Sequence, residues 1–133
     1  MNKLINVVRF DVTDGNKQIY NYIPVMKNGS TKVFINYVLH IDQSSIDQMK
    51  ENSINKLCME ASSEGAWTIN KSVNIPLHAI TGEDFLNISL TFLINNSDNQ
   101  QPINNVDAIL CYMNNEKTRD TIFSTKLPLR KID

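Results

Sequence analysis

Residues 3–41 read KLINVVRFDVTDGNKQIYNYIPVMKNGSTKVFINYVLHI, and the dipeptides Asp14-Gly15 and Asn28-Gly29 divide this stretch into three runs of strand-forming residues. Asn-Gly and Asp-Gly supply the positive φ angles that tight type I′ hairpin turns require. The pattern therefore predicts a three-stranded antiparallel meander, with strands over residues 3–12, 17–25 and 31–41.

The third run shows the clearest alternation. One parity is apolar and predicts a buried face, whereas the other mixes polar residues with Phe34 and Val38. Such a second face needs cover from a helix, another sheet or another subunit.

A helical pattern follows the third run. Ser44 with Asp47 three residues later resembles a capping box. Apolar residues then recur at helical spacing through Ala61, and Gly65 is a plausible terminator. We therefore expect one helix over residues 44–61, packed on a sheet face or closing the end of a sandwich.

The rest of the sequence again shows the residue patterns of β-strands. Within residues 85–95, apolar residues at 86, 88, 90, 92 and 94 alternate with Asn87, Ser89 and Thr91, and residues 95–105 predict a polar loop. Two further strands are expected over residues 106–113 and 121–127, before a loose tail at 128–133. The sum is a mainly β, single-domain antiparallel β-sandwich or partly closed barrel over residues 1–133. It should have seven to eight strands and one α-helix near residues 44–61.

Composition sets limits on function. The chain has 133 residues, 41% of them hydrophobic, and a net charge of −1, which suit an ordinary globular protein. Its 13 basic residues are scattered, which disfavours nucleic-acid binding. No apolar run is long enough for a transmembrane helix. The 18 asparagines fit either codon bias or a polar, uncharged binding surface.

The N-terminal ten residues predict a strand rather than a signal peptide, because Asn6 and Arg9 interrupt their apolar run. We therefore expect cytoplasmic synthesis, with export by a non-classical route or within an assembly left open. Cys58 and Cys111 lie among apolar residues, so we expect buried free thiols.

No constellation of residues predicts catalysis, a metal or a cofactor. His40 and His78 belong to no metal-ligand motif, and no glycine-rich phosphate loop occurs. Buried cysteines are poor nucleophiles. Residues 11–16 contain calcium-type ligands, but Asp and Asn also favour tight turns, and the turn is the preferred interpretation.

The leading hypothesis is a non-enzymatic structural, assembly or accessory protein that binds another protein or itself through a β-sandwich surface. The alternative is a lectin-like carbohydrate-binding module, in which aromatic rings stack on a sugar and amides bond its hydroxyls. The candidate binding residues are Tyr20, Tyr22, Trp67, Asn95, Asn96, Asp98 and Asn99. A small hydrolase using His78, Glu83 and Asp84 is the least favoured interpretation.

Overall fold

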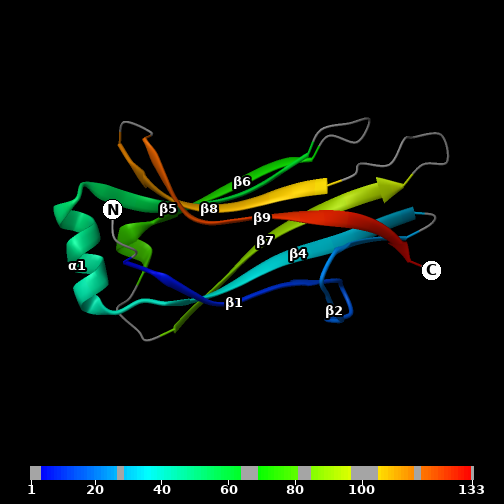
Figure 1. Cartoon of the computed structure of the whole chain (residues 1–133), viewed down its shortest axis with the longest axis horizontal. Coiled ribbons are helices and arrows are strands. Elements are labelled where there is room, and N and C mark those ends of the chain that lie inside the picture. Colours follow the sequence, from blue (N-terminus) through cyan, green and yellow to red (C-terminus); the bar gives the residue numbers. More distant parts are fainter. Residues whose placement is uncertain are drawn as a thin grey trace.

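The computed structural model describes residues 4–26, 29–63, 69–80, 85–96, 105–115 and 118–132. These residues form two β-sheets, with the helix α1 (Gln43–Glu51) at one end (Figure 1). The five-stranded sheet is curled like half a barrel. The mainly β sandwich or partly closed barrel predicted from the sequence is therefore confirmed.

The four-stranded sheet is antiparallel and has the order β2-β1-β4-β7. Its strands are β2 (Ile19–Tyr20), β1 (Asn6–Thr13), β4 (Gly29–His40) and β7 (Phe85–Asn96). β4 pairs with β7 from Gly29, opposite Asn96, to His40, opposite Phe85, with no bulge between them. The alternation predicted for residues 31–41 is confirmed, because Val33, Ile35, Tyr37 and Leu39 are buried.

The five-stranded sheet has the order β3-β9-β8-β5-β6. Its strands are β3 (Ile23–Met26), β9 (Arg119–Ile132), β8 (Asn105–Asn114), β5 (Ile54–Ser62) and β6 (Asn70–Pro76). The pair β3 and β9 is parallel, with Ile23 opposite Leu129 and Met26 opposite Ile132. The tail expected to be loose is thus a paired strand as far as Ile132.

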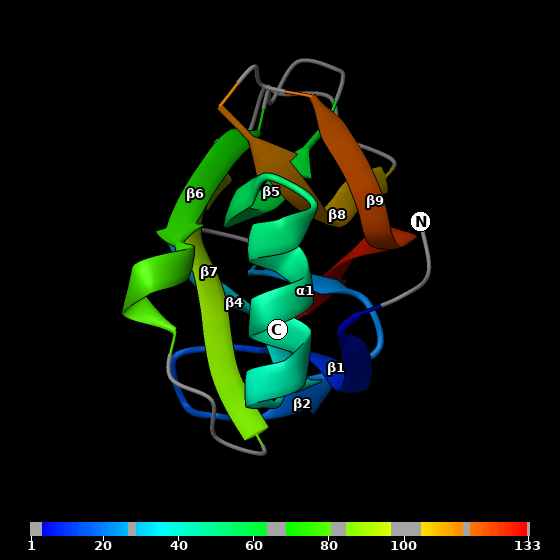
Figure 2. The same cartoon turned by 90° about the vertical axis from the view of Figure 1, so that its left-hand side faces the viewer.

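The core lies between the sheets and extends under the helix. Ile46 and Met49 of α1 are buried in the same apolar cluster as the inward side chains of both sheets. Figure 2 shows α1 standing across the end of the sandwich, as one of the two predicted arrangements requires. After β6, the short 3-10 helix η1 (Leu77–Ala79) adds the buried Leu77. No helix in the described parts of the chain has the length and apolar character needed to cross a membrane.

The helix is shorter than its prediction. It ends at Glu51, and Ser53 adopts a positive φ of 61° before β5 begins at Ile54. Its N-cap is Asp42, whose carboxylate accepts the Ser45 N–H at 2.8 Å, not Ser44. The proposed terminator, Gly65, lies outside the described residues.

The predicted meander is also wrong in its second strand. Residues 17–25 are divided between β2, in one sheet, and β3, in the other, so β3 and β4 do not form a hairpin. Gly29 has the expected positive φ, 92°, but it serves a corner between sheets; Asn28 is not among the described residues. In the first turn, the positive φ falls on Lys17 and not on Gly15, so that turn is not type I′.

Candidate functional site

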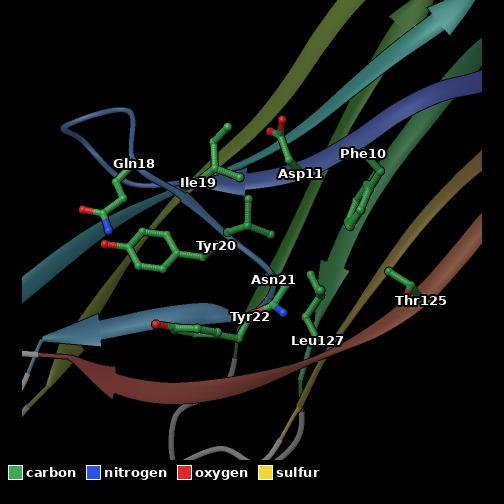
Figure 3. Close-up of a pocket in the computed structure, with 10 residues that line it drawn as sticks. Phe10, Asp11, Gln18, Ile19, Tyr20, Asn21, Tyr22, Thr125 and Leu127 are labelled. Atoms are coloured by element: carbon green, nitrogen blue, oxygen red, sulfur yellow. The ribbon is translucent and has the colours of Figure 1, made fainter.

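A pocket of about 590 Å³ opens where the chain crosses from one sheet to the other. The crossing residues Asn21 and Tyr22 follow β2 and precede β3, so the pocket lies between β1 of one sheet and β9 of the other (Figure 3). Phe10 and Leu127 line its apolar floor, and Gln18, Asn21 and Asp11 bring polar groups. An apolar surface with a few polar groups is typical of small-molecule sites.

Tyr20 and Tyr22 both line this pocket, as the sequence suggested for a shared aromatic surface. Their ring centroids are 5.3 Å apart, the planes are inclined by 61°, and both rings extend to the same side of the crossing segment (Figure 3). The guanidinium carbon of Arg130 lies 5.8 Å from the Tyr22 ring centroid, within range of a cation–π contact. Both rings are half-buried, so each keeps some surface for a ligand or a partner.

Asp14 holds the first tyrosine in place. Its carboxylate accepts the Tyr20 hydroxyl at 2.9 Å and the N–H groups of Asn16 and Gln18 at 2.9 and 3.0 Å. Burial acts to raise the pKa of Asp14, but these hydrogen bonds outweigh it and the pKa is lowered. Burial and the bond to Asp14 raise the pKa of Tyr20. The carboxylate therefore stabilises a turn, which supports the turn interpretation over a calcium loop.

The predicted binding residues are only partly brought together. Asn95 and Asn96 end β7 opposite Ser30 and Gly29 of β4, and Ser30 and Tyr20 line a second pocket, of about 340 Å³. The asparagine strand end and the tyrosine pair thus share one end of the molecule. Trp67, Asp98 and Asn99 lie outside the described residues.

The outer face of the four-stranded sheet is a second candidate surface. No helix or strand among the described residues packs over this face, and α1 lies at the end of the sandwich (Figure 1). Phe34 and Val38 point outward and are half-buried. Phe85 and Leu93 of β7 are 56% and 61% exposed. This surface is therefore partly apolar, as the second face of residues 31–41 predicted.

A polar network runs across the middle of that face. The side-chain amide of Asn36 in β4 donates to the carboxylate of Asp11 at 2.8 Å and to the hydroxyl of Thr13 at 3.1 Å, and the Ser89 hydroxyl of β7 donates to Asn36 Oδ1 at 2.7 Å. Arg9 donates to the other oxygen of Asp11 at 2.9 Å. The network links β1, β4 and β7 through side-chain hydrogen bonds across the face.

The cysteines and histidines show no catalytic pairing among the described residues. Cys58 and Cys111 are buried free thiols, as expected, and face each other across β5 and β8. Burial raises the pKa of Cys111 to about 11, which opposes a reactive thiolate. His78 is exposed on η1, and its suggested partners Glu83 and Asp84 are not described.

The sequence alone missed several residues of these surfaces. Arg130 was placed in a loose tail, and only the parallel pairing with β3 brings it to Tyr22. The exposure of Leu93 was not anticipated either, although its place on the polar parity of residues 85–95 was a signal for it. No known family model matches the chain, and no curated protein is similar to it in sequence.

Proposed function

We propose that this protein is a non-enzymatic assembly or accessory protein that binds another protein chain, or its own copies, through the outer face of the four-stranded sheet. The observation that carries the proposal is the set of apolar side chains on that face: Phe85 and Leu93, toward the two ends of β7, are mostly exposed, and Phe34 and Val38 of β4 are half-buried. Exposed apolar groups gathered on one face mark interaction sites more often than scattered ones do.

The polar network supports the same conclusion. Its side chains are already bonded to one another across three strands, so a partner meets a preorganised surface and loses little conformational entropy there. Elsewhere on the face, Asn87 and Thr91 supply neutral amide and hydroxyl groups, and Arg9 and Lys32 add charges; such groups suit a polar rim around apolar contacts.

The test is capture of binding partners, including the chain itself, from the native source with immobilised protein. We expect a partner that Leu93→Ser loses and that Met26→Ser retains. Met26 is the matched control because it is 42% exposed and lies in β3, in the five-stranded sheet and away from the outer face of the four-stranded one. Equal capture by both variants would contradict the use of this part of the face.

A second candidate function is carbohydrate binding at the tyrosine pocket. It is favoured by one observation, the pairing of Tyr20 with Tyr22 over a pocket that also holds Gln18 and Asn21. Aromatic rings beside amides are the groups that bind the apolar face and the hydroxyls of a sugar. A glycan array should then give signals that Tyr22→Ala abolishes, whereas an array without signals would dismiss this function.

A further inference from the structure

The strands at the sheet edges in the described parts of the chain are protected against pairing to very different degrees. An edge strand presents unpaired N–H and C=O groups, and natural proteins protect it by shortness, charge, proline or a bulge. β2 has two residues, and β3 has four with Pro24 among them. β6 carries Lys71 and ends at Pro76.

β7 has none of these devices. Its twelve residues, Phe85–Asn96, contain no charge, proline or glycine, and its pairing with β4 has no bulge. Among the described residues, no second strand pairs with its other side. Figure 2 shows β7 at the margin of its sheet, on the same side of the molecule as β6.

The order of side chains along β7 is close to symmetrical. The outward positions are Phe85, Asn87, Ser89, Thr91 and Leu93. An antiparallel pair of two β7 strands centred on Ser89 places Phe85 opposite Leu93 of the other copy, and Asn87 opposite its Thr91. Phe85 and Leu93, the two largest exposed side chains of the strand, would then contact each other at two symmetry-related positions. No like charges would lie opposite one another.

We propose that two copies of the chain pair antiparallel through the free edge of β7, centred on Ser89, so that their four-stranded sheets become one continuous sheet. The inference rests on the proposed function and names the partner as a second copy. The symmetry axis passes beside Ser89 and perpendicular to the sheet, so the same strand serves both partners. Backbone hydrogen bonds supply the affinity, and the Phe85–Leu93 contacts fix the register.

The test places a charge at the centre of symmetry. We expect Ser89→Lys and Ser89→Glu each to weaken the dimer by roughly tenfold or more, because each puts like charges directly opposite one another. An equimolar mixture of the two variants should restore the dimer. Both variants lose the bond from Ser89 to Asn36, so recovery in the mixture separates pairing from local damage.

The readout is light scattering after size-exclusion chromatography over a concentration series. The matched control is Asn74→Lys, which adds the same charge at an exposed position of β6 and should leave the dimer intact. In addition, Ser89→Cys under mild oxidation should give a covalent dimer that Asn87→Cys does not. The wild-type chain is the negative control and should give no covalent dimer, because its cysteines Cys58 and Cys111 are buried.

Two results would overturn the inference: a wild-type chain that stays monomeric at every concentration, or a dimer that Ser89→Lys leaves unchanged. These results leave the proposed function standing if a different protein is still captured in a way that depends on Leu93. If the wild-type chain stays monomeric and no other protein is captured, both the dimer inference and the proposed function are wrong.

Discussion

Gly29 and Gly15 place different demands on the backbone, although each follows Asn or Asp in the sequence. Gly29 has φ +92°, which β-branched residues rarely adopt, and no atom lies within 4 Å of a Cβ built there. Gly29→Val should therefore add strain without a clash and lower the free energy of unfolding by about 1–3 kcal/mol. Gly15→Val, at an equally open position without a positive φ, should change it by less than about 0.5 kcal/mol. Urea unfolding of both variants is the measurement, and equal decreases in their free energies of unfolding would contradict this prediction.

Tyr37 and Tyr112 are both buried, but their hydroxyls differ. The Tyr112 hydroxyl accepts the N–H groups of Leu4 and Ile5 at 2.9 and 3.0 Å, so Tyr112→Phe should cost about 1–3 kcal/mol by leaving these amides without an acceptor. The Tyr37 hydroxyl has no hydrogen-bond partner in the described structure. Tyr37→Phe should therefore keep or raise stability, by up to about 1 kcal/mol. Chemical denaturation of the two variants checks the opposite signs.

At the level of elements, the helix shows how far the sequence could predict the fold. Its start was found to within two residues, but residues 54–61 were assigned to it although they form β5. Leu57, Met59 and Ala61 point into the core, while Cys58 is buried on the other face, near Glu60 and Arg119. A strand that is covered on both faces loses its alternation and can match helical spacing by chance. The positive φ of Ser53, which separates the two elements, had no glycine to reveal it.

Asp42 at the N-cap of α1 makes helix stability depend on pH. The hydrogen bond from the Ser45 N–H is the main cause that lowers the pKa of this carboxyl below its ordinary value of 3.8. A lowered folded-state pKa stabilises the fold at pH values above the unfolded-state pKa, and this stability is lost as the pH falls through the folded-state pKa. Asp42→Ala should therefore lower the melting temperature at pH 7 and have a smaller effect near pH 2–3. An effect that does not change with pH would argue against the capping role.

β7 allows a test of alternation within one strand. Leu90 is 1% exposed and belongs to the core cluster, whereas Leu93 is 61% exposed on the outer face. Leu90→Ala should lower the free energy of unfolding by about 2–5 kcal/mol, because it loses buried surface and leaves a cavity. Leu93→Ala should change it by less than about 0.5 kcal/mol. Urea unfolding of both variants is the measurement, and comparable losses would show that the two faces are not distinct.

For the whole molecule, the alternation of residues 31–41 and 85–95 was enough to predict strands with one buried face, but not that these strands pair in one sheet or how the chain divides between the two sheets. The crossing at Asn21 and Tyr22 has no strong sequence signal, since Pro24 is compatible with a strand end in either sheet. The tyrosine pair was predicted as a candidate because both residues share one parity, and the structure places them 5.3 Å apart. The pocket beside them could not be predicted, because it depends on β1 and β9, which are more than 100 residues apart in sequence.

Hydrogen exchange across the whole chain connects this architecture with self-association. β4 and β8 are central strands of their sheets, so their amides should exchange slowest in every form of the protein. β7 pairs on one side with β4, and in a monomer the amides of its other side face solvent. In Ser89→Lys, alternate β7 amides should therefore exchange much faster than in the wild-type chain at high concentration, while β4 and β8 remain unchanged. Faster exchange spread over all strands would instead indicate general destabilisation, and unchanged exchange in β7 would show that its free edge is not paired in the wild-type protein.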